Sequence, residues 1–399
     1  MSMTAQPEPQ RAILVLEDGA YYCGYAFGAE ADAEGEVVFN TGMTGYQEIC
    51  TDPSYRGQIV TLTYPLIGNY GVNQDDVESR RPWLQALVVR EYTPEYSNWR
   101  AVDDLHDYLY RHGIPGMHSA DTRALVRHLR TFGVKRGVLV RVTDEMLPRG
   151  PDGPAMWLTG RTPGTQELVA QLTERAKRII PLSEQPLVEA VTIDAPVHLD
   201  NAGGPRVVVM DCGLKQNIAR SLVRLGADVT IVPYGTPLDE VLRLRPQGVL
   251  VGNGPGDPEA AHRAVSLLRD LVEQNRRDMR LPVMGICLGH QLLGLAIGAH
   301  TSRLKFGHRG GNQPVKDLRT GRVYITTQNH GFQVDAQSIP PKSGFYVSHI
   351  NLNDQSVEGL AHPDLPVWSV QYHPEGAPGP QDNQYLFEQF LQKVVKTTA

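Results

Sequence analysis

The sequence predicts a two-domain protein of the α/β class, in which a mixed α+β domain precedes a domain built on a mostly parallel central sheet flanked by helices. Its 399 residues suggest two or three domains at roughly 150 residues each. From residue 205 onwards, short apolar runs alternate with segments of helical periodicity, which is typical of parallel α/β sheets. The run Asn-Ala-Gly-Gly-Pro at 201–205 indicates the boundary between the two domains.

The first domain is predicted as a mixture of strands and helices. Asp18-Gly19 is a hairpin-turn signal between strands at 12–16 and 21–27. Further strands are expected at 36–40, 58–64, 86–90 and 137–142, and helices at 103–112 and 121–132. Gly133 supplies a stop signal for the second helix.

The second domain is predicted from elements that alternate along the chain. Strands are expected at 207–210, 229–232, 248–251, 282–286, 322–328, 345–350 and 366–372. Helices are expected around 218–225, 258–278, 288–299 and 384–395. The predicted organisation is a mobile tail at 1–10, an N-terminal domain with its connector at 11–204, which includes a helix at 165–177, and a C-terminal domain at 205–399.

Composition and charge argue against several classes of protein. Thirty-eight basic and 44 acidic residues give a net charge of −6, which does not favour a nucleic-acid or anionic-membrane surface. The four cysteines, at 23, 50, 212 and 287, form no Cys-x-x-Cys pair, so neither a disulfide framework nor a zinc site is indicated. No stretch reaches the roughly 18 apolar residues of a membrane span. A cytoplasmic protein without a metal is therefore expected.

The sharpest chemical signal is Gly-Ile-Cys-Leu-Gly-His-Gln at 285–291, where an apolar strand ends and a helix begins at once. This is the pattern of a nucleophile elbow with Cys287 in place of serine. The helix N-terminus favours a thiolate, and the N–H of Leu288 would point to a developing oxyanion. The alternative is a buried core cysteine, the commonest fate of a free cysteine, and this motif alone leaves both open.

A base and its orienting group are predicted from His-Pro-Glu at 373–375, directly after an expected strand. Pro374 holds His373 extended, so that the side chains of His373 and Glu375 can point the same way. The order Cys, His, Glu matches that of an α/β hydrolytic triad. His-x-Glu also occurs in zinc deaminases, but these require a downstream Pro-Cys-x-x-Cys, and no cysteine follows Cys287.

A third motif, Gly-Asn-Gly-Pro-Gly-Asp-Pro at 252–258, follows the strand expected at 248–251. A phosphate-binding loop is the first alternative, but the loop has neither the Gly-x-Gly-x-x-Gly pattern nor a Gly-Lys-Ser/Thr ending. An uncharged Gly/Pro loop suits a carbonyl oxygen better. Its N–H groups are therefore expected to form half of an oxyanion hole.

Together these motifs resemble the triad-type (class I) glutamine amidotransferases. Segments of the first half narrow the resemblance to the small, glutamine-hydrolysing subunit of carbamoyl phosphate synthetases. These segments are 40–48, 51–55, 59–65 and 67–69, supported by 305–312 and 328–332 in the second half. The resemblance runs from about residue 12 to the last predicted helix. It implies a class I amidotransferase domain at 205–399, preceded by a small-subunit domain that binds the partner and borders the glutamine pocket.

The resemblance assigns roles to individual positions. Cys287 would attack the glutamine side-chain amide, His373 would take the thiol proton and later protonate ammonia, and Glu375 would orient His373. Oxyanion donors would be the backbone N–H groups of Gly254 and Leu288. Glutamine contacts would fall on Ser54, Gly254, Gly256, Leu288, Gln291, Asn329, Gly331 and Phe332.

The resemblance also implies a division of labour between two chains. Ammonia would pass to a large synthetase subunit, in a heterodimer or a higher assembly of heterodimers, which makes carbamoyl phosphate from bicarbonate and ATP for arginine and pyrimidine synthesis. ATP and Mg²⁺ would belong to that partner, with no cofactor on this chain.

Two alternatives remain open at the level of sequence. One is an amidotransferase subunit for another acceptor, as in anthranilate or guanylate synthesis. The other is a regulatory subunit that has lost catalysis, although Cys287, His373 and Glu375 are all present. For His308 and His330, a structural role is at least as strongly expected as a substrate contact.

Overall fold

The computed structural model describes residues 9–146, 153–162, 164–201 and 203–396. Residues 1–8 of the predicted tail at 1–10 lie outside the described residues. The chain forms two compact units. The first takes residues 1–50, 57–76 and 84–181, and the second takes residues 51–56, 77–83 and 182–399. Two short segments from the N-terminal half of the sequence therefore belong to the second unit.

The first unit is a closed barrel with the strand order β1-β2-β8-β6-β4-β3-β9. Its strands are β1 (Arg11–Leu16), β2 (Tyr21–Gly28), β3 (Ala33–Asn40), β4 (Gln58–Leu62), β6 (Ala86–Val88), β8 (Pro115–His118) and β9 (Lys135–Arg141). The hairpin predicted at Asp18-Gly19 joins β1 to β2, and Gly19 has a φ of 87° that suits a tight turn. The closure of the barrel was not predicted from the sequence.

Helices and two short strands complete the first unit. They are α1 (Tyr46–Thr51), α2 (Leu105–Arg111), α3 (Thr122–Phe132), α4 (Gly153–Leu158), α5 (Thr165–Lys177), β5 (Leu66–Ile67) and β7 (Glu91–Tyr92). Asp104 and Asp121 cap α2 and α3 by accepting from the free N–H groups of the first turn. Leu168, Val169 and Leu172 of α5 pack in one buried cluster with residues of β1 and β9.

The second unit is built on one large sheet with the order β10-β12-β11-β13-β14-β19-β18-β17-β15-β16. The strands β11 (Arg206–Asp211), β12 (Asp228–Pro233), β13 (Gly248–Val251), β14 (Val283–Ile286) and β19 (Val367–Val370) are parallel to one another. Antiparallel strands flank them, namely β10 (Val197–Leu199), β15 (Thr301–Asp317), β16 (Val323–Val334), β17 (Tyr346–Asn351) and β18 (Val357–Ala361). The predicted α/β class with a mostly parallel centre is confirmed.

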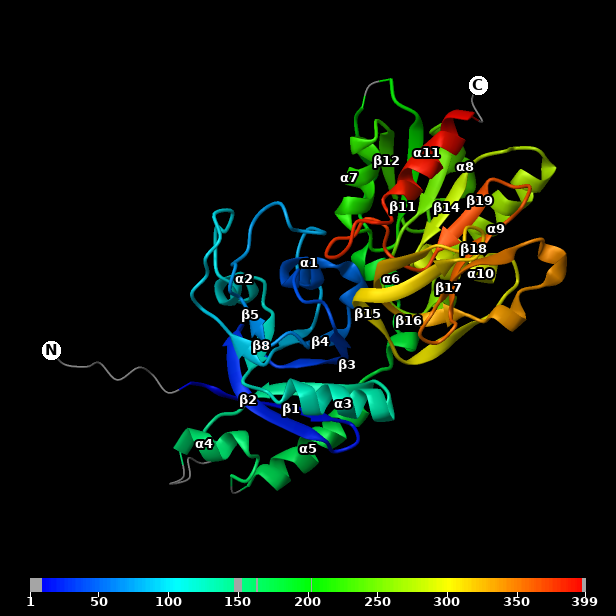
Figure 1. Cartoon of the computed structure of the whole chain (residues 1–399). Coiled ribbons are helices and arrows are strands. Elements are labelled where there is room, and N and C mark those ends of the chain that lie inside the picture. Colours follow the sequence, from blue (N-terminus) through cyan, green and yellow to red (C-terminus); the bar gives the residue numbers. More distant parts are fainter. Residues whose placement is uncertain (1–8, 147–152, 163, 202, 397–399) are drawn as a thin grey trace. The chain divides into compact units, whose positions relative to one another are not determined.

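Helices cover both faces of the parallel centre (Figure 1). They are α6 (Leu187–Val191), α7 (Gln216–Arg224), α8 (Leu238–Arg243), α9 (His262–Arg277), α10 (Leu288–Ala296) and α11 (Tyr385–Lys396). Leu268 of α9 and Leu292 of α10 belong to one buried cluster, whereas Leu222 of α7 and Phe390 of α11 belong to another. Because helices pack on each face, the parallel strands are apolar on both sides and appear in the sequence as continuous apolar runs.

The order of the parallel strands positions the chemistry-bearing loops. β13, β14 and β19 are neighbours and run in the same direction, so their carboxyl ends meet at one edge of the sheet. The glycine-rich loop at 252–258, Cys287 and the His-Pro-Glu segment each follow one of these ends. Ligands of open α/β sheets bind at this edge.

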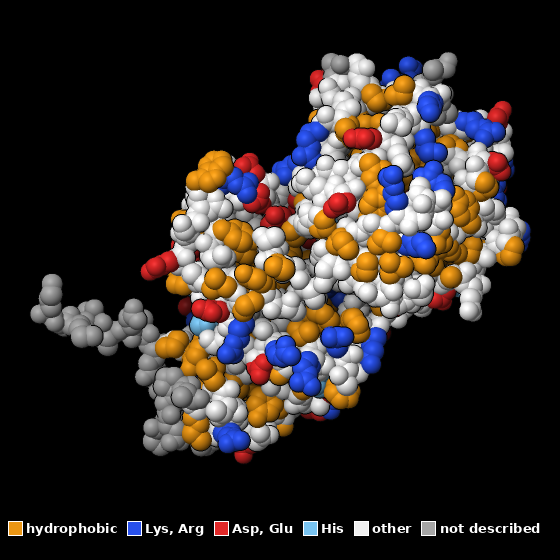
Figure 2. All heavy atoms as spheres, in the orientation of Figure 1, with side chains coloured by type: hydrophobic (Ala, Val, Ile, Leu, Met, Phe, Trp, Pro, Cys, Tyr) orange, Lys and Arg blue, Asp and Glu red, His pale blue; other side chains and the backbone are white. Residues whose placement is uncertain are grey.

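On the face of the molecule shown in Figure 2, acidic and basic side chains are interspersed with apolar ones, and neither sign forms a continuous stripe. This distribution agrees with the modest net charge of −6. Across the described ranges, no helix combines the length and apolar character needed to cross a membrane.

Candidate active site

Cys287 occupies a strained turn between β14 and α10. Its φ of 53° and ψ of −103° are unusual for a residue with a side chain, and such strain is characteristic of nucleophile elbows. The flanking glycines permit the turn, because a Cβ on Gly285 would come within 2.5 Å of the Gly289 carbonyl oxygen. A Cβ on Gly289 would overlap the Val251 carbonyl oxygen. The elbow geometry therefore agrees with the prediction from the sequence motif.

His373 and Glu375 form a buried pair at the end of β19. Nδ1 of His373 lies 2.7 Å from Oε1 of Glu375, and both side chains are almost fully buried. The backbone N–H of His373 donates to the Thr327 carbonyl of β16, which fixes the segment across the sheet. Nε2 of His373 has no nitrogen or oxygen partner in the described chain. That nitrogen is therefore free to exchange a proton with the Cys287 sulfur, and the hydrogen bond between the two side chains helps to raise the pKa of His373.

Lys215 joins this pair and was not predicted from the sequence. Its Nζ donates to Oε1 of Glu375 at 2.8 Å, and its side chain is 1% exposed. Lys215 follows the carboxyl end of β11, the same edge of the sheet at which the triad assembles. Asp211 supports the intervening turn, because its Oδ1 accepts from the N–H groups of Gly213 and Leu214. The only feature of the sequence that could have pointed to Lys215 is its position just beyond the end of a predicted strand.

The buried charges set the protonation states of the triad. Burial by itself lowers the pKa of His373, but the Glu375 carboxylate and the Cys287 sulfur outweigh burial and raise it to about 10. Burial raises the pKa of Glu375, but Lys215 and His373 outweigh it and lower the pKa to about 2. For Lys215, Glu375 and Glu78 outweigh burial and raise the pKa. The geometry thus favours an imidazolium beside Cys287, as a thiolate nucleophile requires.

The two predicted oxyanion donors have suitable free groups. In the described part of the chain, neither the N–H of Gly254 nor that of Leu288 has an acceptor. Leu288 is the first residue of α10, so the helix dipole adds to its N–H. Gly254 needs the absence of a side chain, because a Cβ there would overlap the Cys212 carbonyl oxygen. These groups can stabilise negative charge that develops on an oxygen beside Cys287.

Ser54 belongs to the second unit, although the sequence placed it in the N-terminal domain. Its Oγ accepts from Nδ2 of Asn253 at 3.0 Å, and its N–H donates to Oδ1 of Asp52 at 2.9 Å. Oδ2 of Asp52 in turn accepts from Nδ2 of Asn329 at 2.8 Å. The segment 51–56 is thereby attached to the glycine-rich loop at 252–258 and to β16. Asp52 and Asn253 are positioning residues that were not predicted.

The remaining predicted glutamine contacts lie around the same elbow. The Cys287 sulfur lies 3.6 Å from the Asn329 carbonyl oxygen. Nε2 of Gln291, on α10, donates to the Phe332 carbonyl at 2.8 Å and to Gln371 at 3.0 Å. Asn329 and Phe332 are therefore joined to the elbow through Cys287 and Gln291.

Two glycines are less directly connected to the site. Gly256 has a φ of 87° and lies against Leu187 of α6. Gly331 lies beside Arg309, whose Nη2 would be 3.5 Å from a Cβ at that position. Their roles as glutamine contacts stay predictions.

His290 is excluded as the base by its environment. Its Nδ1 lies 2.9 Å from Oγ of Ser369, and burial lowers its pKa to about 3. It is a neutral, packed ring within α10.

Comparison with known proteins identifies the family. The model for the carbamoyl-phosphate synthase small chain, CPSase domain, matches residues 14–139, and the model for class-I glutamine amidotransferases matches residues 208–393. The carbamoyl phosphate synthase small chain of Symbiobacterium thermophilum is 50% identical over 376 residues, which cover 94% of this chain and 96% of that protein.

Two further relatives span nearly the whole chain. The small chain of Thermus thermophilus is 46% identical and covers 96% of this chain and 93% of its own length. The small chain of Aquifex aeolicus is 44% identical and covers 95% of this chain and 98% of its own length. A crystal structure from Thermoplasma acidophilum, described as that of a putative GMP synthase subunit, covers 49% of this chain and 96% of its own, with 21% identity and a TM-score of 0.42. The resemblance inferred from the motifs is confirmed: the chain belongs to the carbamoyl phosphate synthase small chains and carries their class-I glutamine amidotransferase domain.

Proposed function

We propose that this chain hydrolyses L-glutamine through a thioester on Cys287 and delivers the ammonia to a large synthetase subunit. Three features support this most directly. They are the strained backbone of Cys287, the buried His373–Glu375 pair, and the N–H groups of Gly254 and Leu288, which have no acceptor among the described residues. The predicted roles of Cys287, His373 and Glu375 are kept in this scheme.

The chemistry follows from the charges at the site. His373 first takes the proton of the Cys287 thiol, which leaves a thiolate beside an imidazolium. The thiolate attacks the amide carbon, and the carbonyl oxygen becomes an oxyanion held by the N–H groups of Gly254 and Leu288. His373, protonated beside Glu375, gives its proton to the departing nitrogen, so ammonia leaves and a thioester forms. Water then attacks the thioester while His373 accepts its proton, which releases glutamate and restores the thiolate. Lys215 keeps Glu375 ionised throughout.

The second reaction is assigned to a partner. Relatives along almost the whole chain are named small chains of carbamoyl phosphate synthase, which supports a large-chain partner. On that partner, ammonia, bicarbonate and ATP with Mg²⁺ would yield carbamoyl phosphate for arginine and pyrimidine synthesis. The match of residues 14–139 to the small-chain domain favours this acceptor over those of other amidotransferases.

Replacement of the nucleophile tests the proposal. Cys287→Ser is expected to abolish glutamine-dependent carbamoyl phosphate synthesis by the two-chain enzyme while ammonia-dependent synthesis persists. Cys212→Ser is the control, since Cys212 is buried outside the triad. A glutamine-mimicking electrophile should label the wild type at Cys287. Undiminished glutaminase activity in Cys287→Ser would contradict the proposed mechanism.

A further inference from the structure

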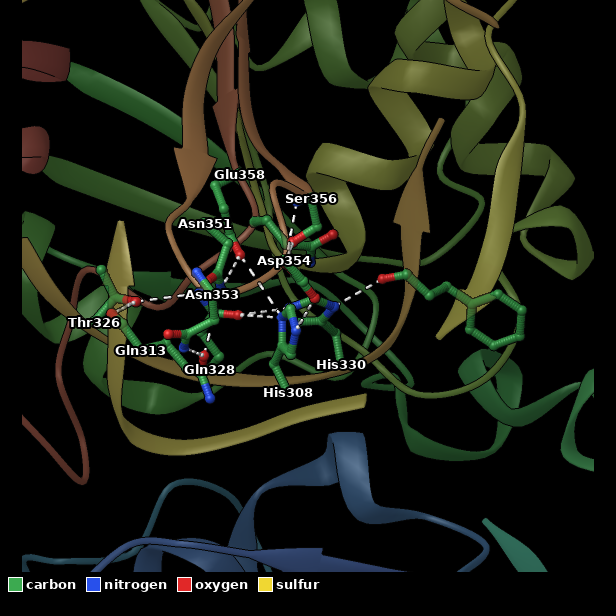
Figure 3. A network of polar contacts seen from close by, with 12 residues as sticks. His308, Gln313, Thr326, Gln328, His330, Asn351, Asn353, Asp354, Ser356 and Glu358 are labelled. Atoms are coloured by element: carbon green, nitrogen blue, oxygen red, sulfur yellow. Dashed lines mark hydrogen bonds and ion pairs between the residues drawn. The ribbon is translucent and has the colours of Figure 1, made fainter. Parts of the chain in front are cut away.

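A second buried polar cluster lies beside the glutamine pocket and is not used by the triad. His308 on β15, Gln328 and His330 on β16, and Glu358 on β18 are all buried, and Asp354 lies between β17 and β18. Figure 3 shows the rings of His308 and His330 directed toward the side chain of Gln328. The ring centroids are 5.0 Å apart.

The orientation of the Gln328 amide follows from its neighbours. The hydroxyl of Thr326 donates to the Gln313 carbonyl at 2.9 Å, so its oxygen can accept only from an N–H group. Nε2 of Gln328 supplies that group at 3.1 Å. The carbonyl oxygen of Gln328 therefore faces the two histidines, with His308 Nδ1 at 3.1 Å and His330 Nε2 at 2.7 Å.

His308 is set up to carry two protons. Its Nδ1 faces the Gln328 oxygen, and its Nε2 faces Oδ2 of Asp354 at 2.8 Å, so both ring nitrogens must donate. Oε1 of Glu358 lies 3.8 Å from Nδ1. Burial lowers the pKa of His308, but Asp354 and Glu358 outweigh burial and raise it. Burial also raises the pKa of Glu358 to about 7, so its full charge supports His308 only above that pH.

His330 has one proton for two acceptors. Its Nδ1 lies 2.7 Å from the Phe332 carbonyl, and its Nε2 lies 2.7 Å from the Gln328 oxygen. Burial lowers its pKa well below the ordinary value, and the charges of His308 and Arg309 and the nearby His290 act in the same direction. His330 is therefore neutral, and its tautomer decides which oxygen receives the proton.

We propose that a proton on His308 sets the tautomer of His330 and thereby the hydrogen bonding of the Phe332 carbonyl at the glutamine pocket. While His308 is doubly protonated, its Nδ1–H donates a hydrogen bond to the Gln328 oxygen. That oxygen then does not need the His330 proton, so His330 donates its single proton from Nδ1 to the Phe332 carbonyl. When His308 loses the proton on Nδ1, the Gln328 oxygen loses that donor. The tautomer of His330 that is protonated on Nε2 then becomes favoured, because it donates to the Gln328 oxygen. The lone pair of His330 Nδ1 then faces the Phe332 oxygen at 2.7 Å, a repulsive contact that in the first state lies instead between Nε2 and the Gln328 oxygen, which are also 2.7 Å apart.

This change reaches the site through Gln291. Nε2 of Gln291 donates to the same Phe332 carbonyl, and Gln291 follows Cys287 by four residues on α10. Displacement of that carbonyl alters two predicted glutamine contacts without touching the triad. The inference rests on the proposed glutaminase function, and it predicts an effect on KM for glutamine rather than on kcat. Affinity falls as the pH rises through the pKa of His308.

A metal site is the competing interpretation of this cluster. Donor atoms of His308, His330 and Glu358 all lie within 4.8 Å of one another. However, the Gln328 oxygen already lies within hydrogen-bond distance of both histidines, 3.1 Å from His308 Nδ1 and 2.7 Å from His330 Nε2, whereas a metal ligand needs its lone pair free. The hydrogen-bonded arrangement therefore favours a proton relay.

Kinetics on the two-chain enzyme between pH 6 and 9.5 test the inference. Asp354→Asn removes the closest charge from His308, so the alkaline rise in KM should move about one unit to lower pH, with kcat within twofold of wild type. Glu358→Gln should shift the rise in the same direction and change nothing below about pH 7. Asp317→Asn is the matched control, because Asp317 is a buried carboxylate at the end of β15 with its own partners, Arg319 and Thr320.

Titration of glutamine itself is common to all four enzymes, so it cannot produce a difference between them. A KM profile of Asp354→Asn that superimposes on wild type overturns the inference. So does an equal shift in Asp317→Asn.

Nitrogen NMR of the ¹⁵N-histidine-labelled full chain gives a readout that does not depend on activity. His330 should carry its proton on Nδ1 at neutral pH and on Nε2 at high pH, and Asp354→Asn should move this exchange to lower pH. A single tautomer throughout overturns the inference even if glutaminase activity is normal. Loss of glutaminase activity in the wild type, with the tautomer exchange intact, would instead contradict the proposed function alone.

Discussion

At the scale of single residues, the charge balance of the site depends on Lys215. It is buried and donates to Glu375, so its removal leaves a carboxylate without its cation. Lys215→Met is expected to lower kcat/KM for glutamine at least about tenfold, because one pKa unit in the His373–Glu375 pair equals about 1.4 kcal/mol. The free energy of unfolding should fall by about 3–5 kcal/mol.

Glutaminase kinetics and urea unfolding measure the two effects of Lys215→Met. Lys316→Met provides the control, because Lys316 is only half-buried on β15. Equal kinetics for Lys215→Met and wild type would show that Lys215 is only a packing residue.

The triad should also make stability depend on pH. The folded pKa of His373 is raised to about 10, so its contribution is complete below about pH 6.5 and is lost as the pH rises toward 10. The folded pKa of Glu375 is lowered to about 2, so its contribution is present above about pH 4.5 and is lost as the pH falls toward 2. Urea unfolding of wild type and His373→Gln should show a difference that shrinks from about pH 6.5 upwards as the pH approaches 10. A constant difference up to pH 10 would contradict the raised pKa.

The sequence predicted the residues of the triad but not the residues that position them. Cys287, His373 and Glu375 stand in short motifs whose backbone geometry follows from the flanking glycines and proline, so local chemistry identifies them. Lys215 and Asp52 act through partners far along the chain, at Glu375 and Asn329. Such pairings depend on strand order, which no local pattern encodes.

At the scale of elements, the elbow depends on close backbone approach between β13 and α10. The Gly289 N–H donates to the Gly252 carbonyl at 3.1 Å, and a Cβ at Gly289 would overlap the neighbouring Val251 oxygen. Gly289→Ala should therefore displace Cys287 and lower glutaminase activity by about 100-fold or more, as misplacement by about 1 Å does. Gly311→Ala is the control, because its Cβ would meet no atom closer than 3.3 Å. A crystal structure of an active Gly289→Ala with an unmoved elbow would contradict this account.

Most elements were predictable, because apolar periodicity and stop signals are local. The strands expected at 12–16, 248–251 and 282–286 correspond to β1, β13 and β14, and the helix expected at 121–132 corresponds to α3. The barrel was not predicted, because its closure joins β3 to β9, which are about 100 residues apart in the sequence. Apolar segments predict where strands lie in the sequence, but they do not predict which strands pair with one another.

At the scale of the whole molecule, the two compact units do not correspond to two continuous halves of the sequence. The sequence placed the boundary at the Gly/Pro run ending at 205, whereas the long continuous part of the second unit already begins at residue 182. Val188 of α6 lies in a buried cluster of that unit, and Thr192 and Ile193 donate to Asp211. Glycine and proline mark a turn here, and the buried contacts of the preceding residues decide where the unit begins.

The segments 51–56 and 77–83 make the second unit depend on the N-terminal half of the chain. The Glu78 carbonyl accepts from the Gln216 N–H at 2.7 Å, and its carboxylate accepts from Asn217, so Glu78 caps α7 next to Lys215. Asp52 and Ser54 bind Asn329 and Asn253. A fragment of residues 182–399 lacks all of these partners.

This fragment is therefore expected to unfold at lower urea than the second unit of the full chain and to show no glutaminase activity. The matched control is the full chain cut at a protease site introduced between residues 181 and 182, which keeps both segments in place. The cut chain should retain glutaminase activity within a fewfold of wild type, because its site keeps Asp52, Ser54 and Glu78. Equal activity of the fragment and the cut chain would show that the two segments are dispensable. Inactivity of both would show that the covalent link itself is required.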